Sequence, residues 1–206
     1  MAGLLTCVVK RSRESGLDIQ LAGDNPEVFN VIARFGLIRG CRTHVAFVVD
    51  GGKARCMAAD EAIGYWGQKI VLAAQDMGFN TCWCALCSRK KSRAVVAPGK
   101  KIRLIIAVGH GKTQGFPRKT KSVETLSSVE CAKAPAWFAA AMEAAQLAPT
   151  AMNNQNFKIT LLSDGKTVRI DAPQSGLNVI DEGIVRCNFE IAANEAGADW
   201  RWEREM

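Results

Sequence analysis

The sequence has no apolar run long enough to cross a membrane. Hydrophobic residues make up 48% of its 206 residues and charged residues 23%, which is ordinary for a soluble globular chain. No stretch approaches the roughly 18–20 apolar residues that a spanning helix needs. Residues 1–16, MAGLLTCVVKRSRESG, do not have the order of a secretory signal, because the basic cluster follows the apolar patch. We therefore expect a cytoplasmic protein that does not bind a membrane.

Histidine is also scarce, which limits the metal sites that the chain can build. His44 and His110 are the only histidines, although there are eight cysteines, three of them in the stretch GFNTCWCALCSRKK at positions 82, 84 and 87. The spacing C-x-C-x2-C supplies three thiolates, and no second C-x2-C or histidine pair completes a zinc or iron–sulfur site. The stretch therefore leaves three interpretations open: a metal site, buried core cysteines, or the small-residue lining of a ligand site. We predict no bound metal.

Recognised nucleic-acid motifs are missing as well, although the chain is basic. Its formal charge is +7, with basic clusters at 10–13, 89–93, 100–103 and 118–121. A basic surface attracts nucleic acid, but it equally attracts phosphorylated cofactors. Because no helix-turn-helix, zinc-finger or aromatic RNA-binding signature accompanies the clusters, we expect no nucleic-acid partner.

Helical and extended patterns alternate along the chain, which indicates an α/β or α+β fold. Gly16, Gly78 and Gly197 are predicted to end helices, and Pro26 and Asp181 to begin them. Trp66 is predicted to pack in the core, with Gly64 and Gly67 allowing close helix contact. Residues 109–122 form a glycine- and lysine-rich loop. The predicted helices are 4–13, 26–35, 58–77, 135–148 and 181–197. The predicted strands are 17–22, 43–50, 102–111, 157–164 and 167–172, with an extended segment after Gly78.

Four stretches in this order resemble the nitroreductase family of flavoproteins. They are AADEAIGYWGQKIVLAAQDMGFNTCW (58–83), VGHGKTQGFPRKTKS (108–122), APAWFAAAMEAAQLAPTAMNNQNFKITL (134–161) and IDEGIVRCNFEIAANE (180–195). They are most similar to the single-chain branch, in which two halves of one polypeptide imitate the usual homodimer. The resemblance covers nearly the whole chain from residue 4.

The resemblance implies an α+β fold with a mixed sheet flanked by helices and two similar halves, expected at residues 1–130 and 131–206. It also implies FMN at the junction of the halves, NADH or NADPH as electron donor, and a nitro-aromatic, quinone-like or other small organic acceptor. The expected activity is that of an FMN-dependent oxidoreductase, and the expected state is a monomer or homodimer. No side chain is identifiable as a catalytic acid or base.

The resemblance also assigns the FMN-binding residues. One segment is expected to run beneath the flavin ring, a basic loop to hold the phosphate, and a loop after a helix to reach the ring and ribityl chain. In that order the residues are Thr81, Cys82, Trp83, Cys84 and Ala85; Arg118, Lys119 and Lys121; and Pro149, Thr150, Ala151 and Asn153. The alternatives are a solvated basic loop for 109–122 and helix-capping or turn chemistry for 149–155.

The chain departs from the family pattern in two places. Asn156-Phe157 replaces the family's Pro-Trp after Gln155. The family opens with an R-R-S-x-R motif that grips the FMN phosphate, whereas this chain begins where the segment after that motif is expected. The similar run KRSRES (10–15) has flanks that match a later region. An alternative function is therefore a flavin-poor, inactive relative that binds a ligand or a partner.

Overall fold

The computed structural model describes residues 1–30, 38–52, 58–115, 117–130 and 133–203. These residues form two compact units. Unit 1 comprises Met1–Ala59 and Lys69–Phe116, and unit 2 comprises Asp60–Gln68 and Pro117–Met206. These unit boundaries differ from the expected boundary after residue 130. The similarity of the two halves stays a prediction. Within the described ranges, no helix has both the length and the apolar character needed to span a bilayer.

Unit 1 is built on a four-stranded antiparallel sheet with the order β1-β2-β4-β3. The two inner strands, β2 and β4, carry the runs VAFVV and LIIAV, which are buried along nearly their whole length. Strands rich in valine and isoleucine suit this central position, because β-branched side chains pack well on a pleated surface. The strands are β1 Asp18–Ala22, β2 Thr43–Asp50, β3 Asn80–Cys84 and β4 Lys100–Gly109.

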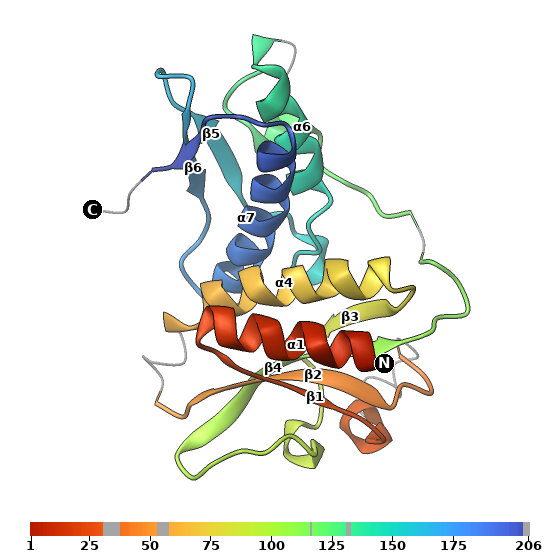
Figure 1. Cartoon of the computed structure of the whole chain (residues 1–206). Coiled ribbons are helices and arrows are strands. Elements are labelled where there is room, and N and C mark those ends of the chain that lie inside the picture. Colours follow the sequence, from red (N-terminus) through yellow and green to blue (C-terminus); the bar gives the residue numbers. More distant parts are fainter. Residues whose placement is uncertain (31–37, 53–57, 116, 131–132, 204–206) are drawn as a thin grey trace. The chain divides into compact units, whose positions relative to one another are not determined.

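Helix α1 (Ala2–Ser15) packs along this sheet beside β1 (Figure 1). It buries Leu4 and Val8, four residues apart on one face, and leaves Leu5 49% exposed. Gly16 ends it in the left-handed conformation at φ 71°, as predicted. Residues from Lys69 onward of the longer helix α4 (Asp60–Asp76) also belong to unit 1, where Ile70 is fully buried.

The other face of the sheet is covered by two short 3-10 helices, η1 (Pro26–Phe29) and η2 (Arg89–Lys91). Phe29 of η1 belongs to a hydrophobic cluster with Ile105 and Cys84 of the sheet. The predicted helix 26–35 begins at Pro26 as expected, and its residues 31–35 lie outside the described part.

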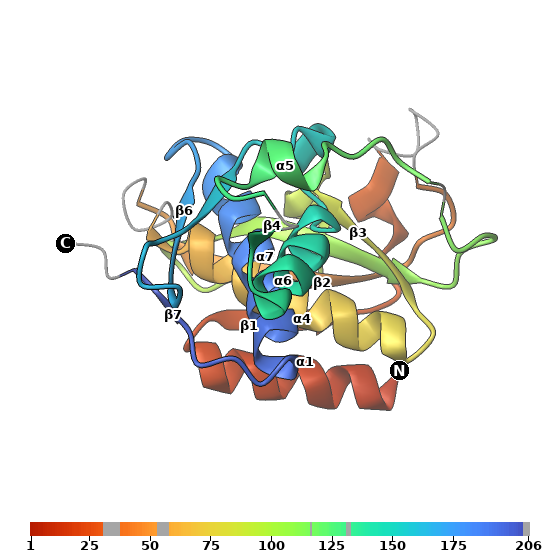
Figure 2. The same cartoon turned by 90° about the horizontal axis from the view of Figure 1, so that it is seen from above.

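Unit 2 combines a three-stranded sheet with a pair of long helices. In the sheet, with the order β5-β6-β7, β5 and β6 are antiparallel and β7 is parallel to β6, so this sheet is mixed. Helices α6 and α7 lie side by side (Figures 1 and 2) and bury Phe138, Met142 and Phe189. The elements are α5 Val123–Leu126, α6 Ala136–Gln146, η4 Ala151–Asn153, β5 Lys158–Leu161, β6 Thr167–Asp171, α7 Asn178–Glu195 and β7 Arg201–Trp202.

Two glycines let α7 pass close to the first part of α4 inside unit 2. A Cβ on Gly64 would lie 2.0 Å from the carbonyl oxygen of Ile180, and one on Gly183 would lie 2.0 Å from that of Glu61. Close helix contact through Gly64 was predicted, and it is confirmed.

The predicted start of α7 at Asp181 is wrong. The helix begins at Asn178, and Asp181 is a buried residue within it. Its carboxylate accepts a hydrogen bond from a different segment, the backbone N–H of Ala151, instead of capping its own helix. Asp181, which the sequence suggested as a helix start, therefore makes a tertiary contact instead.

Candidate functional site

A hollow in unit 1 has a volume of about 590 Å³ and lies where β3 and β4 meet the segment before β2. Its walls come from residues 38–43, 79–82 and 107–111, together with Met1. Strand β3 is the edge strand of its sheet, so no described strand pairs with its outer backbone groups. The volume is in the range of small-molecule sites in proteins.

Two of the five residues predicted to run beneath a flavin line this pocket, namely Thr81 and Cys82. Trp83 does not line the pocket, and its ring stacks on that of Phe47 with centroids 6.1 Å apart. Cys84 is 2% exposed and belongs to the hydrophobic cluster, so its thiol does not line the pocket. Ala85 follows the end of β3 and is half-buried.

Basic side chains outside the set of predicted FMN-binding residues also line the pocket. Arg39 is exposed and has no partner among the described residues, whereas Arg42 forms an ion pair with Asp24. The ring of His110 packs against that of Phe79, with ring centroids 4.9 Å apart. The sequence signal that could have pointed to these residues is the run Arg39-Gly40-Cys41-Arg42 before the predicted strand 43–50. It combines glycine with basic residues, as the predicted phosphate-binding loop 109–122 does.

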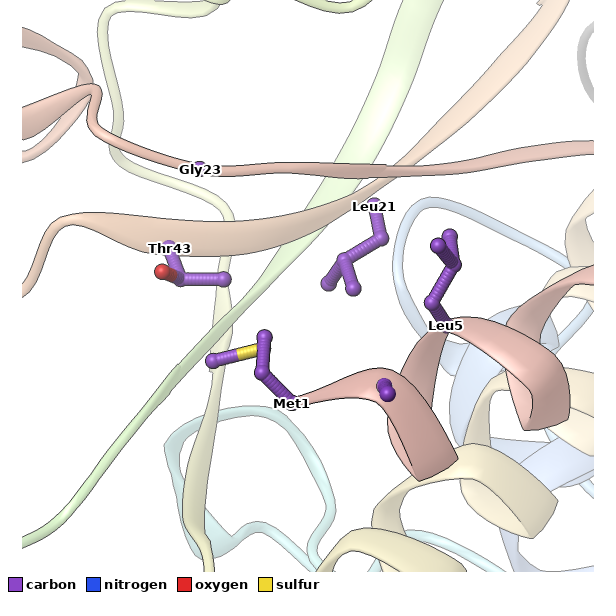
Figure 3. Close-up of a pocket in the computed structure, with 6 residues that line it drawn as sticks. Met1, Leu5, Leu21, Gly23 and Thr43 are labelled. Carbon is purple, nitrogen blue, oxygen red and sulfur yellow. The ribbon is translucent and has the colours of Figure 1, made fainter.

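A second, smaller hollow of about 200 Å³ lies between α1 and β1 in unit 1 (Figure 3). Met1, Leu5 and Leu21 point into it, and Thr43 is at its edge. Its lining is mostly apolar and offers no charged side chain. Among the described side chains that line it, the hydroxyl of Thr43 is the one group that could orient a polar cofactor.

In unit 2, the loop between α6 and β5 holds an unusual backbone conformation. Met152, Asn153 and Gln155 have φ values of 53°, 55° and 45°, in the left-handed region that residues other than glycine rarely adopt. Met152 is 92% exposed, so packing of its own side chain does not hold it there. Strain of this kind is frequent at binding sites, where the surrounding contacts enforce it.

The predicted phosphate-binding residues hold this loop in place. The Arg118 guanidinium donates to the carbonyl oxygens of Leu147 and Ala148 at 2.6 and 3.1 Å, at the end of α6. The Lys121 ammonium donates to the carbonyl of Gln155 at 3.0 Å. Burial lowers the pKa of Arg118. These two cations are therefore engaged with backbone carbonyls.

Lys119 and Asn153 are placed differently. The amide of Asn153 donates to the backbone carbonyl of Lys119 at 2.7 Å, which brings the two predicted segments together within unit 2. The exposed ammonium of Lys119 has no partner in the described part of the chain. The Oδ1 atom of Asn153 is buried and accepts no hydrogen bond from a described residue.

The remaining predicted residues of this loop have structural uses. The buried hydroxyl of Thr150 accepts the backbone N–H of Gln155 at 3.0 Å, and Pro149 is half-buried between α6 and η4. Ala151 donates its N–H to the Asp181 carboxylate at 2.9 Å. Burial raises the pKa of Asp181 to about 6. The turn-chemistry alternative therefore accounts for the Thr150 side chain.

The three clustered cysteines do not converge on one point. The thiol of Cys84 lies 3.2 Å from the carbonyl of Cys82, and that of Cys87 lies 3.6 Å from the carbonyl of Cys84. Across the residues that the structure describes, no three histidine, cysteine or acidic side chains gather as a metal site would require. The absence of a metal stays a prediction.

Comparisons with known proteins give one family and one fold. The model of a family described as "Putative TM nitroreductase" matches residues 3–193. A crystal structure described as a "putative nitroreductase" from Thermotoga maritima matches with a TM-score of 0.61 and 22% identity, over 87% of this chain and 67% of the other. At this identity the likeness shows a shared fold. A search of curated proteins found no match.

Proposed function

The chain belongs to the "Putative TM nitroreductase" family, and from this premise we propose that it is an FMN-dependent oxidoreductase. The resemblance of the four sequence motifs to nitroreductases is thereby confirmed. In the proposed activity NADH or NADPH is the electron donor, and a nitro-aromatic, quinone-like or other small organic molecule is the acceptor. When bound, FMN supplies the ring that accepts and returns a hydride.

The observation that carries the proposal is the pairing of residues 118–121 with the strained loop 149–155. Three contacts fix it: Arg118 to the end of α6, Lys121 to Gln155, and Asn153 to Lys119. Within the described residues, the ammonium of Lys119 and the buried Oδ1 acceptor of Asn153 are left without a partner. Nearly all buried polar atoms in proteins have a partner, so an orphaned acceptor supports a ligand that donates to it.

These residues fit the chemistry of FMN. Its phosphate matches the ammonium of Lys119, and its ribityl hydroxyls or ring N–H match the Oδ1 atom of Asn153. Arg118 and Lys121 would act as positioning residues that hold the loop.

The test is a titration with FMN and with riboflavin, which lacks the phosphate. A charge-assisted contact contributes roughly 1.5–3 kcal/mol, so Lys119→Ala should weaken FMN binding about ten- to a hundredfold and leave riboflavin unchanged. Lys158→Ala, which removes an exposed lysine from β5 in the same unit, is the matched control and should bind FMN like the parent. Arg118→Ala should weaken the binding of both FMN and riboflavin, because it removes the hydrogen bonds to the carbonyls at the end of α6.

Activity is read as acceptor-dependent oxidation of NADH or NADPH by the FMN-loaded protein. If the purified protein is colourless and millimolar FMN neither quenches in fluorescence nor raises the melting temperature, the flavin-poor alternative replaces the proposal. If FMN binds but Lys119→Ala behaves like Lys158→Ala, the phosphate is held elsewhere, and the exposed Arg39 of unit 1 is then the cation to test.

A further inference from the structure

Asp181 is a buried carboxylate in the first turn of α7 that bonds to a different segment of unit 2. Its Oδ1 atom accepts the backbone N–H of Ala151 at 2.9 Å. Within the described part of the chain, that N–H is the group that bonds to the carboxylate, and no cation pairs with it. Burying a carboxylate without a cation costs free energy, so the contact with Ala151 is the use for which this charge is retained.

The contact supplies the cap that the short 3-10 helix η4 lacks. Ala151 is the first residue of η4, and the side chain of the preceding Thr150 makes no capping hydrogen bond. The Thr150 hydroxyl instead accepts the N–H of Gln155, at the other end of the turn. Asp181 therefore caps η4 from α7, and two side-chain oxygens hold the loop, one at each end.

The residues between these two contacts are the strained ones, and one of them carries the unpartnered acceptor. Met152 and Asn153 have φ values of 53° and 55°, which persist only where surrounding contacts enforce them. The amide of Asn153 donates to the carbonyl of Lys119 at 2.7 Å, and its buried Oδ1 atom accepts no hydrogen bond from a described residue. The conformation of η4 therefore determines where this acceptor points and where the backbone of Lys119 lies.

We infer that Asp181 is a positioning residue for flavin binding, because its carboxylate holds loop 149–155 in the conformation that offers Asn153 and Lys119 to FMN. This role depends on the proposed function, in which FMN is the ligand of the loop. The carboxylate acts through the N–H of Ala151 and not through the cofactor. Asp181→Asn keeps an acceptor oxygen at this place and can fulfil the same role, whereas Asp181→Ala cannot.

The first experiment measures, without flavin, how firmly the loop is held. Hydrogen exchange at the amides of residues 152–155 should be about three- to tenfold faster in Asp181→Ala, as expected for the loss of one hydrogen bond, and close to the parent rate in Asp181→Asn. Glu195→Ala, which removes an exposed carboxylate from the other end of α7, is the matched control and should exchange like the parent. Equal exchange in all four proteins would show that Asp181 does not hold the loop.

The second experiment titrates the same proteins with FMN and with riboflavin at pH 7.5. The carboxylate is charged there, because burial raises its pKa only to about 6. Asp181→Ala should weaken both ligands about three- to tenfold, since Asn153 serves the ring or ribityl part that they share. Asp181→Asn should rescue most of this loss.

The outcomes separate this role from the proposed function. Failure of the parent to bind FMN would refute the proposed function and this role with it. If the parent binds FMN, but Asp181→Ala binds equally well or Asp181→Asn is as weak as Asp181→Ala, the positioning role alone is refuted.

Ala151→Pro tests the same contact from the donor's side and keeps Asp181. Proline has no N–H, and its fixed φ suits the first position of a helix. Thr150 before it is already extended, with ψ 155°, as a residue preceding proline requires. Ala151→Pro should reproduce the effects of Asp181→Ala on exchange and on binding, and the two effects should not add in the double variant. Additive effects would show that Asp181 acts through another contact and would overturn the inference.

Discussion

Asp181 is the carboxylate through which α7 holds the strained loop of unit 2. It is 9% exposed, and its Oδ1 atom accepts the N–H of Ala151. Burial disfavours its charged form, which raises its pKa from 3.8 to about 6. Because the folded pKa lies above the unfolded value, the folded state binds the proton more tightly than the unfolded state does. The free energy of unfolding therefore falls as the pH rises from about 4 to above 6.

Asp181→Asn should remove this pH dependence. One pKa unit corresponds to 1.36 kcal/mol, so between pH 4 and pH 7 the variant should gain roughly 2–3 kcal/mol in free energy of unfolding relative to the parent. Its amide oxygen can still accept the N–H of Ala151. The measurement is chemical unfolding at several pH values.

The control for this experiment is Asp171→Asn, which neutralises an exposed carboxylate on β6. Its difference from the parent should stay nearly constant over the same pH range. A parallel pH dependence in the Asp181 variant and the parent would show that Asp181 is not the group that titrates.

At the scale of elements, the crossing of α4 and α7 depends on two glycines that face carbonyl oxygens. A substituted Cβ would have to come within 2.0 Å of a backbone atom, which no rotamer change relieves. Alanine usually stabilises a helix by up to about 1 kcal/mol relative to glycine. In this place the clash outweighs that gain, because the two helices would have to separate.

Gly64→Ala and Gly183→Ala should each lower the free energy of unfolding by about 3 kcal/mol or more. Denaturant titration followed by circular dichroism measures the change. Gly52→Ala is the matched control, since a Cβ there would meet nothing within 4 Å, and it should change stability by less than about 0.5 kcal/mol. A small effect at both helix positions would mean that the helices do not pack so closely.

At the scale of the whole molecule, α4 is one helix that takes part in both units. Its residues up to Gln68 belong to unit 2, and those from Lys69 belong to unit 1. Either part is too short to stay helical alone in water, since isolated helices under about 12–15 residues are marginal. Unfolding of one unit therefore removes support from a helix that the other unit needs.

We expect thermal unfolding to occur as one transition, with a calorimetric enthalpy equal to the van't Hoff enthalpy. Gly64→Ala, which acts inside unit 2, should shift this transition to lower temperature without splitting it. Two separate transitions in the parent or in the variant would show that the units unfold independently.

Local chemistry in the sequence was enough to predict most elements. Alternating or continuous apolar runs gave the strands 43–50 and 102–111, which the structure has at Thr43–Asp50 and Lys100–Gly109. Gly16 and Gly78 follow the ends of α1 and α4 in the left-handed conformation, as their lack of a Cβ allows. These features depend on neighbours along the chain, so the residues themselves carry the signal.

The candidate site was predictable only in part. The family motifs predicted both 118–121 and 149–155 as FMN-binding segments, and the structure pairs these two segments. The motifs did not predict which residues of the two segments bind each other. Sequence gives no means to tell that Arg118 binds backbone carbonyls while the Lys119 side chain is exposed. In the same way, the pocket beside Cys82 depends on Arg39, which reaches it only through the fold.

The sequence by itself determined the family, the alternation of helices and strands, and the positions of the glycine-terminated helices. Only the tertiary structure decided that Asp181 lies within α7, that α4 is shared by two units, and that Cys82 alone of the three clustered thiols is exposed. Periodicity and turn chemistry act between residues a few positions apart. Burial, pKa and partner choice depend on residues that are distant in sequence, and these are brought together only when the chain folds.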